Sequence, residues 1–540
     1  MCGIIGVFKS NPSTCDNEII EGFDLLNKRG PDSSKYINTK KEFLGFKRLA
    51  INDLSALGDQ PMIYEDKLAD RNITLICNGE IYNYLELIED YDLKCTSRSD
   101  CEVILRLYIK FGIEKTLTLL YGVFAFIIRD TIEQDTTVYA ARDRIGIRPL
   151  FIGNTIDNNI AFASEAKALI KFCINVKQVE PSTYMSLSPS DKDQPTDLFS
   201  TTYYSLPNKI GTTFSFDELK TKLEQAVYKR LDCCDRPVGC LLSGGLDSSI
   251  IASIICKSDH YKTKKLNTYS VGMEGSEDLK YAKIVANYLG TNHTEVKFTA
   301  KEGFDAISKV IFSLESYDIT TVRASVGMYL LCKYISENTN DRVIFSGEGS
   351  DELLCGYLYF HNAPSPEELF DESYRLVKTL YLYDVLRGDR CVSSNGLELR
   401  VPFLDQRFSE YCLRIPGELR APQNGIEKYI LRMAFEGDLP DEIIWRRKAA
   451  FSDAVSGPEK KWYQQIQEFV DKIVSDAIFE HYSVRFPSKE AYYYWKIFNE
   501  FFYGFKNPIP EYWMPKWSKE ANGNPSATVL NVYKDKLKKD

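Results

Sequence analysis

The segment Ser243–Ser249, with the sequence Ser-Gly-Gly-Leu-Asp-Ser-Ser, constrains the fold of this chain more than any other feature. It follows an apolar run over Pro237–Leu242 that is typical of a buried strand, and it precedes a helical pattern. Glycines after a strand let backbone N–H groups approach phosphate oxygens, and the next helix adds partial positive charge. Because seven positions fit this context, we interpret the segment as a nucleotide phosphate site rather than an ordinary turn.

The surrounding pattern predicts an α/β domain. Further strands are predicted at Leu266–Val271 and Arg342–Phe345, the second running into Ser346–Glu352, and alternating strands and helices indicate a parallel sheet. Asp247 and Asp351 each follow a strand, and their hard oxygen ligands would suit Mg²⁺, although each alone is more simply a helix cap. The absence of a Gly-Lys-Thr/Ser ending disfavours transfer of a γ-phosphate.

The N-terminus offers a second kind of chemistry. If Met1 is trimmed, Cys2 carries both a thiol and a free α-amine. The ordinary pKa of an α-amine is about 7.7–8, so a good fraction is neutral at pH 7 and can act as base for the thiol. A buried structural cysteine is the simpler alternative. A Cys–His pair in the first 200 residues is excluded, because the four histidines are His260, His293, His361 and His481.

Length and composition limit the class of protein. A chain of 540 residues is too long for one core, and its 44% hydrophobic and 26% charged residues are typical of globular proteins. We see neither an apolar run of about 18 residues nor a secretory leader. The net charge of −9 disfavours general nucleic-acid binding. Fourteen cysteines without a Cys-x-x-Cys pair do not fit a zinc site and indicate a reducing cytosol.

The N-terminal pattern predicts a layered α+β domain. Strands are predicted at 4–8, 122–128 and 137–143, and a helix at 100–108. Residues 72–83 are predicted to form a strand, a turn at Asn-Gly and a continuation.

A polar segment, Ser186–Ser215, is predicted to link the domains and to be ordered only in part. An amphipathic helix at 218–231 follows it, and the chain after the α/β pattern is predicted to be mostly helical, with a frayed end at 534–540. We therefore divide the chain into domains at 1–200 and 215–520 and a tail at 521–540.

Several motifs resemble those of known families. The first part resembles a class II glutamine amidotransferase domain at Cys2, Arg29–Asp32, Arg48–Ile51, Asn78–Asn83, Ser99–Asp100 and Arg142–Leu150. The second part resembles the synthetase domain of the glutamine-hydrolysing asparagine synthetase family at Ser243–Ser249, Tyr269–Gly272, Ser346–Glu352 and Gly396–Asp405. The motifs follow the order and spacing of the family over about residues 1–500.

This resemblance implies an αββα domain of the N-terminal-nucleophile type and an α/β domain of the ATP-pyrophosphatase type. It implies synthesis of asparagine from aspartate, ATP and ammonia released from glutamine, through a β-aspartyl adenylate, with AMP, pyrophosphate and glutamate as further products. The implied partners are these small molecules and Mg²⁺, with no nucleic acid or membrane. A homodimer stays open, and the expected location is cytoplasmic.

The resemblance also assigns roles in glutamine hydrolysis. Cys2 would attack the glutamine amide, and Asn78 and Gly79 would stabilise the oxyanion. Arg48 would hold the α-carboxylate of glutamine, and Asp100 with Glu80 its α-ammonium; a surface cation and a helix cap are the simpler alternatives for Arg48 and Asp100. The implied glutamine-binding residues are Arg48, Leu49, Ala50, Ile51, Asn52, Asn78, Gly79, Glu80 and Asp100.

In the second domain, Asp247 and Asp351 would carry Mg²⁺. Arg323 and Lys448 would meet phosphate and developing negative charge, and Glu348 would act in intermediate formation or in ammonia deprotonation. Ammonia is expected to cross between the domains through an apolar passage. The implied ATP-binding residues are Leu241, Ser243, Gly244, Gly245, Asp247, Ser248, Val271, Ser346 and Gly347.

Some segments depart from the family pattern. Val326-Gly327 replaces a Thr-Pro pair, Ala449–Ser456 lacks two glycines of a loop expected to close over pyrophosphate, and Phe46–Arg48 replaces a segment that contains histidine. Two rival functions are disfavoured by the residues present. A β-lactam-forming synthetase would have lost the nucleophile, whereas Cys2 is present. A catalytically silent scaffold is disfavoured because the site residues above are retained.

Overall fold

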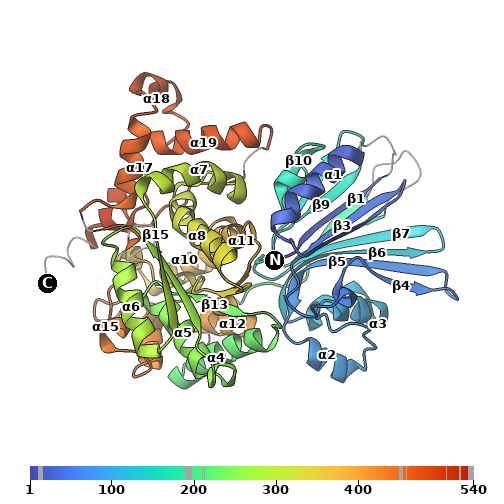
Figure 1. The fold of residues 1–540 in the computed structure, drawn as a ribbon, viewed down its shortest axis with the longest axis horizontal. Coiled ribbons are helices and arrows are strands. Elements are labelled where there is room, and N and C mark those ends of the chain that lie inside the picture. The colour runs from blue at the N-terminus through green and yellow to red at the C-terminus, as the bar shows by residue number, and fades with distance from the viewer. Residues whose placement is uncertain are drawn as a thin grey trace.

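The computed structural model describes residues 1–9, 16–188, 197–208, 211, 213–448, 454–457, 459–505, 508–521 and 524–532. A domain rich in strands, on the right in Figure 1, packs against a larger domain rich in helices. The first contains the N-terminal residues, and the second contains the chain from α4 (Phe216–Asp232) onward.

Two six-stranded antiparallel sheets form the N-terminal domain. In spatial order, the first sheet contains β10 (Cys173–Gln178), β8 (Phe151–Thr155), β9 (Ile160–Ala163), β1 (Gly3–Phe8), β3 (Glu42–Arg48) and β2 (Ser33–Asn38). The second contains β12 (Asp197–Thr202), β11 (Thr183–Ser188), β7 (Asp135–Arg142), β6 (Gly122–Ile132), β5 (Arg71–Ile81) and β4 (Met62–Asp66).

The two sheets are stacked between layers of helices. Ile4 on β1 packs with Ile127 of the other sheet, whereas its neighbour Ile5 packs with Phe23 on α1 (Asp16–Asp24). Successive side chains of a strand point to opposite faces, so one apolar strand serves two layers. The second sheet is covered by α2 (Tyr84–Tyr91) and α3 (Glu102–Leu119). This arrangement confirms the layered αββα prediction.

The turn predicted at Asn78-Gly79 is wrong. Strand β5 continues through both residues, with Asn78 opposite Ala125 and Gly79 opposite Phe124 on β6. The eleven-residue ladder between β5 and β6 supplies cross-strand hydrogen bonds that outweigh the local turn preference of Asn-Gly. A Cβ on Gly79 would lie 2.7 Å from the Val123 carbonyl oxygen, so glycine permits this close approach.

A five-stranded parallel sheet lies at the centre of the C-terminal domain, as predicted. The predicted strands correspond to β14, β13 and β16, and two edge strands were not predicted. In spatial order, the sheet contains β15 (Asn292–Lys297), β14 (Asn267–Gly272), β13 (Val238–Leu241), β16 (Val343–Phe345) and β17 (Glu398–Arg400).

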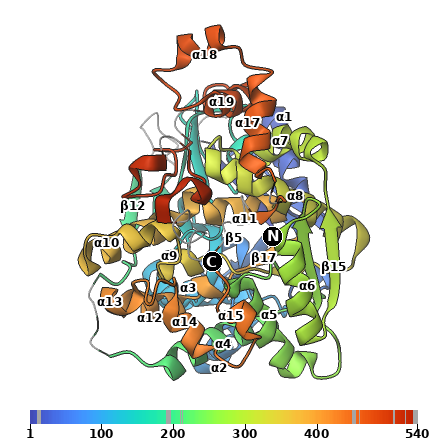
Figure 2. The ribbon, with the colours of Figure 1, turned by 90° about the vertical axis from the view of Figure 1, so that its left-hand side faces the viewer.

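Helices surround this sheet and form the rest of the domain, in agreement with the predicted helical pattern (Figure 2). The later helices α17, α18 and α19 project beside α7 in both views. The helices after α4 are α5 (Leu246–Lys257), α6 (Glu277–Leu289), α7 (Ala300–Leu314), α8 (Ile319–Asn338), α9 (Ser350–Leu353), α10 (Pro366–Thr379), α11 (Asp384–Ser393), α12 (Gln406–Arg414), α13 (Gly417–Arg420), α14 (Tyr429–Ala434), α15 (Asp441–Ile444), α17 (Trp462–Asp471), α18 (Asp476–Tyr482) and α19 (Lys489–Phe501).

The predicted linker contains a strand that was not expected. Strand β12 pairs with β11 along six residues, and it therefore extends the second sheet. Within the predicted tail, Leu530 is only 2% exposed and packs in an apolar cluster with Tyr359. The frayed end predicted at 534–540 and most of the altered loop after Lys448, residues 449–453, lie outside the described residues.

One apolar cluster continues across the contact between the domains. It joins Leu49, Tyr121 and Val123 of the N-terminal domain to Leu223 and Leu404 of the other.

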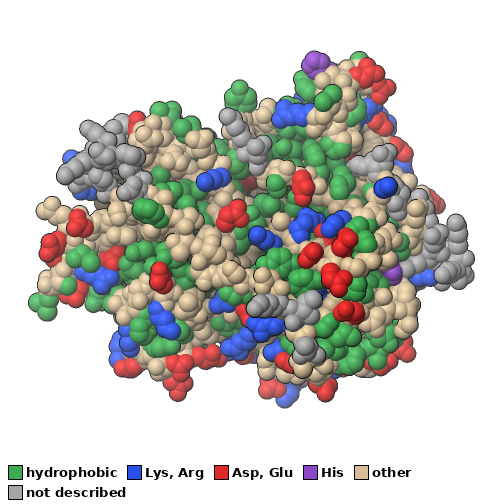
Figure 3. All heavy atoms as spheres, turned by 180° about the vertical axis from the view of Figure 1, so that it is seen from behind, with side chains coloured by type: hydrophobic (Ala, Val, Ile, Leu, Met, Phe, Trp, Pro, Cys, Tyr) green, Lys and Arg blue, Asp and Glu red, His purple; other side chains and the backbone are tan. Residues whose placement is uncertain are grey.

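On the face shown in Figure 3, Lys and Arg side chains lie next to Asp and Glu over the C-terminal domain. Among the residues that the structure describes, no helix is both long and apolar enough to cross a bilayer.

Two glycines allow a test of the loop before α5. Gly244 and Gly290 have φ angles of +69° and +67°, but only a Cβ on Gly244 would meet backbone, 2.3 Å from the nitrogen of Ala282. We expect Gly290→Ala to cost about 1 kcal/mol for the left-handed conformation. Gly244→Ala should cost about 1–3 kcal/mol more because of overpacking, and should lower Tm further in calorimetry. Equal changes in Tm would contradict this close packing.

Candidate active sites

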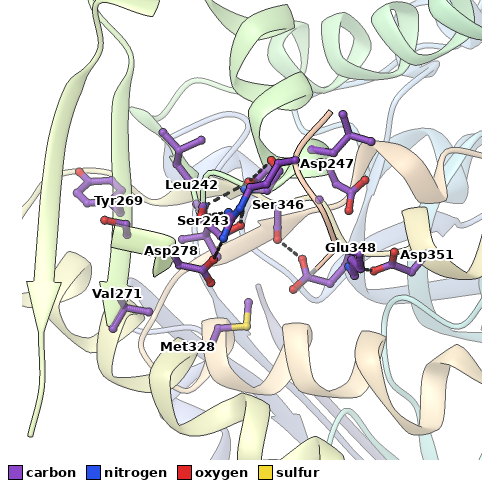
Figure 4. Close-up of a pocket in the computed structure, with 18 of the residues that line it drawn as sticks. Leu242, Ser243, Asp247, Tyr269, Val271, Asp278, Met328, Ser346, Glu348 and Asp351 are labelled. Atoms are coloured by element: carbon purple, nitrogen blue, oxygen red, sulfur yellow. Dashed lines mark hydrogen bonds and ion pairs between the residues drawn. The ribbon is translucent and has the colours of Figure 1, made fainter. Parts of the chain in front are cut away.

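A cavity of about 180 Å³ opens at the carboxyl ends of β13, β14 and β16 (Figure 4). This is the place where a parallel sheet presents its ligands. In Figure 4, Tyr269 and Val271 lie on the opposite side of the pocket from Asp351. The predicted residues that line the cavity are Leu241, Ser243, Gly245, Asp247, Ser248, Val271, Ser346, Gly347, Glu348, Asp351 and Lys448.

Gly244 is not part of the lining, because it is packed against the backbone of α6 at Tyr281 and Ala282. The loop that contains it is held internally by serine side chains. Ser248 Oγ accepts a hydrogen bond from the Ser243 amide at 3.2 Å, and the Ser249 hydroxyl donates to the Gly245 carbonyl at 2.7 Å. The side chains of the motif thus support the loop that borders the cavity.

A lysine that the sequence did not predict bridges the two aspartates of the cavity. Lys428 Nζ lies 2.6 Å from Asp247 Oδ2 and 2.7 Å from Asp351 Oδ1, and Lys448 Nζ lies 2.5 Å from Asp351 Oδ2. Burial alone would raise the pKa of Asp351, but the two ammonium groups outweigh it and hold that pKa well below its ordinary value. Lys428 follows Glu427 in an unremarkable sequence, so no motif indicated it.

The chemistry of these two aspartates fits Mg²⁺. Both carboxylates face one cation, the Lys428 ammonium, and Mg²⁺ typically binds one or two carboxylates while substrate phosphates and water complete its ligands. Among the described residues, no group of three or more His, Cys, Asp and Glu side chains is arranged to hold a metal. A metal here would therefore depend on phosphate oxygens as well.

Glu348 is held at the edge of the cavity. Its carboxylate accepts a hydrogen bond from the Ser346 hydroxyl and lies 3.1 Å from Arg387 on α11. Arg387 also lines the cavity and was not predicted. Arg323, which was predicted to meet phosphate, is not part of the lining, because its guanidinium pairs with Glu490 at 2.6 Å.

The second candidate site surrounds Cys2, the residue directly before β1. Its Sγ donates to the Leu49 carbonyl at 3.6 Å, while the Met1 ammonium donates to the Leu397 carbonyl of the other domain at 3.1 Å. Burial lowers the pKa of the Met1 amine to about 6 and raises the pKa of the Cys2 thiol to about 11. With Met1 in place, the amine is therefore mostly neutral at pH 7, and the thiol keeps its proton.

Asn78 supplies an unused donor in this region. Its side chain is 1% exposed, and the amide nitrogen Nδ2 finds no hydrogen-bond partner among the described residues. A buried donor without a partner carries a free-energy cost, and such a group is explained when a ligand supplies the acceptor. The packing of β1 against β5 brings the strands of Cys2 and Asn78 together.

Arg48 contacts its own loop in this structure. Its guanidinium donates to Asp59 Oδ1 at 2.8 Å and to the carbonyls of Asn52, Asp53 and Ser55. The predicted carboxylate-binding arginine thus fixes the loop that follows β3. Contact with a substrate carboxylate would require it to exchange at least one of these acceptors.

Acidic side chains converge beside this loop. Asn52 donates to Glu80 at 2.9 Å, and Arg400 of the C-terminal domain lies 3.0 Å from the same carboxylate. Burial, and then the neighbouring carboxylate of Glu398, raise the pKa of Glu80 well above its ordinary value. Burial also raises the pKa of Asp100 to about 6, against a hydrogen bond from the Ile81 amide. Two predicted partners of an ammonium ion, Glu80 and Asp100, therefore lie close together as buried acidic groups beside Arg400.

A buried arginine that received no role from the sequence holds the backbone of Cys2. Arg29 Nε donates to the Cys2 carbonyl at 2.8 Å, and its other nitrogens pair with Glu165 at 2.8 Å and Asp389 at 2.8 Å. Arg29 belongs to the motif Arg29–Asp32, so the sequence did single out this residue. No sequence motif indicated Asp389 on α11.

Comparisons with known proteins agree with this two-site geometry. Residues 1–226 match the glutamine amidotransferase domain family, and residues 218–373 and 364–522 match the asparagine synthase family. The chain is 43% identical over 571 residues to the glutamine-hydrolysing asparagine synthetase of Gallus gallus, covering 99% of this chain and 100% of that protein. The same enzyme of Rattus norvegicus is 43% identical, and that of Homo sapiens 42%, each with full coverage of both chains.

The pKa values at the N-terminus give a testable difference between two forms of the chain. While Met1 is present, the Cys2 pKa of about 11 leaves little thiolate at pH 7.5, and only the thiolate is alkylated efficiently. We expect iodoacetamide to modify Cys2 at least tenfold more slowly in chains that retain Met1 than in trimmed chains. Mass spectrometry of the N-terminal peptides separates both forms in one sample, with Cys95 as the internal reference. Equal rates would contradict the expectation.

Proposed function

The chain belongs to the glutamine-hydrolysing asparagine synthetase family, and we propose how its two sites share the reaction. That reaction is the ATP-driven synthesis of asparagine with glutamine as the nitrogen donor. We assign hydrolysis of glutamine to the site at Cys2 and activation of aspartate to the cavity of the parallel sheet. The unpartnered Asn78 amide, close to the strand that carries Cys2, is the observation that supports the first assignment most strongly.

Glutamine hydrolysis begins after Met1 is removed. The α-amine of Cys2 accepts the thiol proton, and the thiolate attacks the amide carbon of glutamine. The Asn78 side chain and the Gly79 backbone N–H donate to the oxyanion, where one such donor is typically worth about 3–4 kcal/mol. Ammonia leaves with the proton from the amine, and water then hydrolyses the thioester to glutamate.

Glutamine is recognised by its two charged ends. Asp100 and Glu80 attract the α-ammonium, and Arg48 exchanges a loop carbonyl for the α-carboxylate. The loop residues Leu49 to Asn52 border the substrate, and the position of this loop therefore governs affinity. These contacts are distant from the reacting amide, so they act on binding more than on the chemical step.

Aspartate is activated in the cavity. The adenosine part of ATP lies against Leu241, Val271, Ser346 and Gly347, and the phosphates face the loop at Ser243–Ser248. A β-carboxylate oxygen of aspartate attacks the α-phosphorus and releases pyrophosphate. Ammonia then attacks the β-carbonyl of the adenylate, giving asparagine and AMP.

Charged side chains of the cavity support these steps. Lys448 and Lys428 balance phosphate charge, and Glu348 takes a proton from the attacking ammonia. Asp247 and Asp351 would hold Mg²⁺, which would neutralise charge on the pyrophosphate when bound. Contact of Arg323 with phosphate requires its ion pair with Glu490 to open.

Ammonia reaches the cavity through the apolar contact between the domains. Tyr121, Val123 and Ile147 lie in that cluster, and they also line a small cavity of about 20 Å³. Asp143, Arg144 and Arg230 also line this cavity, so the proposed passage rests on the apolar cluster, which favours neutral ammonia over the ammonium ion. We also propose a cytosolic location, since the chain carries scattered thiols that suit a reducing compartment.

Removal of the nucleophile separates the two sites. We expect Cys2→Ala to abolish glutamine-dependent synthesis of asparagine and to leave synthesis from ammonium chloride within about twofold of the unmodified chain, because only the ammonia supply fails. Chromatographic assay of asparagine and glutamate measures both reactions. Loss of ammonia-dependent synthesis in a folded Cys2→Ala protein would refute the division into two sites.

The raised pKa of Asp100 predicts a pH dependence. Asp100 is ionised above pH 6 and neutral below it, so its attraction for the glutamine ammonium is lost as the pH falls through 6. We expect neutralisation of Asp100 to add about a tenfold fall in kcat/KM for glutamine per pH unit below 6, on top of the fall caused by protonation of the Cys2 amine.

Asp100→Asn serves as the control for this titration. The variant should have a raised glutamine KM at pH 8 and should lack this part of the pH dependence. Its KM values for aspartate and ATP, measured with ammonium chloride, should stay unchanged. A variant with the same pH profile as the unmodified chain would contradict the assignment.

A further inference from the structure

The segment Cys233–Arg236 belongs to the C-terminal domain, yet it contacts the loop that we assign to glutamine. The Asp235 amide donates to the Ile51 carbonyl at 3.0 Å, and Asp235 Oδ2 accepts from the Asp53 amide at 3.0 Å. Arg236 Nε donates to the Ala50 carbonyl at 2.8 Å. These bonds join three of four successive loop residues, Ala50 to Asp53, to one point of the other domain.

A second layer of contacts holds the same segment in place. Arg236 lies 3.0 Å from Asp32, whose carboxylate also accepts the Ala50 amide at 2.9 Å. Arg98 lies 2.9 Å from Asp235, and its own amide donates to Asp53 at 2.9 Å. The contact between the domains is therefore a connected network rather than a single ion pair.

Asp53 shows why the loop needs this support. Its φ angle is +54°, in the left-handed region that non-glycine residues adopt at a cost in free energy. Arg48 holds its carbonyl from inside the domain, and Asp235 holds its amide from outside. Asn52, which donates to Glu80 in the glutamine pocket, directly precedes it. The conformation at Asp53 thus sets the direction of a side chain that we assign to substrate.

The loop residues are buried, whereas the side chains of Asp235 and Arg236 that bind the loop are partly exposed. Ala50 and Ile51 are 5% and 2% exposed, whereas the side chains of Asp235 and Arg236 are 38% and 29% exposed. Substitution of the two charged side chains therefore removes hydrogen bonds without opening a cavity in the core. Each lost bond leaves a buried loop group without its partner, and this favours displacement of the loop.

We propose that Asp235 and Arg236 are positioning residues of the glutamine site, contributed by the synthetase domain. They act through the loop Ala50–Asp53 and touch no reacting atom. The inference rests on the proposed function, and it makes glutamine affinity a property of both domains. Arg236 lies two positions before β13, the first strand of the parallel sheet in chain order, so the positioning residues belong to the C-terminal domain.

The test uses full-length Asp235→Ala and Arg236→Gln, with Lys229→Gln as a matched control, because Asp235→Asn would keep an acceptor oxygen for the Asp53 amide. Lys229 on α4 pairs with Glu86 on α2, also across the domain contact and at 28% exposure, but it touches no residue of the loop. We expect the glutamine KM for glutamate release to rise at least fivefold in each of the first two variants, with kcat within twofold. The control should match the unmodified chain, and Arg236→Lys should recover part of the affinity.

Ammonia-dependent synthesis separates positioning from general damage. Its kcat and its KM values for aspartate and ATP should be unchanged in all variants. An unchanged glutamine KM, a fall in kcat alone, loss of ammonia-dependent synthesis, or the same KM rise in the Lys229 control would each overturn the proposal. Failure of the proposed function itself would show independently, as glutamine-dependent synthesis that survives Cys2→Ala.

Discussion

The buried guanidinium of Arg29 is the interaction on which the placement of the two domains depends. Arg29 is 1% exposed. It donates hydrogen bonds to one carboxylate from each domain, Glu165 and Asp389, and to the backbone carbonyl of Cys2. Buried charges are tolerated only when they are paired and hydrogen-bonded, and separation of the domains would leave this cation with one of its two carboxylates. The arginine that holds the backbone of Cys2, the proposed nucleophile, is thus itself held from both domains.

The same few elements of the C-terminal domain face both sites. Helix α11 places Arg387 in the nucleotide cavity and Asp389, two residues later, against Arg29. On β17, the side chain of Arg400 pairs with Glu80, while its carbonyl accepts the amide of Ser346 beside the cavity. Rigid elements that carry groups to two places offer a physical route for coupling. Through α11 and β17, a change at the proposed nucleotide site could alter glutamine binding without a large movement of either domain.

Electrostatic arrangement distinguishes the two sites. The cavity is built from opposed charges, with Lys428 and Lys448 beside Asp247 and Asp351, so its polar groups are already oriented where phosphate charge would arrive. The glutamine site instead gathers buried carboxylates with raised pKa values, Glu80 and Asp100, which a substrate ammonium would stabilise. This difference is consistent with the proposal that one site binds anionic phosphate and the other a zwitterionic amino acid.

The sequence by itself determined the features that depend on neighbouring residues. Strand and helix periods, the glycine loop at Ser243 and the special position of Cys2 all follow from local chemistry. They predicted a layered α+β domain and a parallel sheet, whereas the αββα order was implied by the family resemblance. The tertiary structure decided where distant segments meet. Strand β5 continues through Asn78-Gly79 because the hydrogen bonds of a long ladder outweigh a local turn preference. The packing of the domains also places Lys428, Asp389 and Asp235 beside residues that are distant in the sequence. Single charged residues without a motif leave no local signal, since their partners are set by the packing of whole domains.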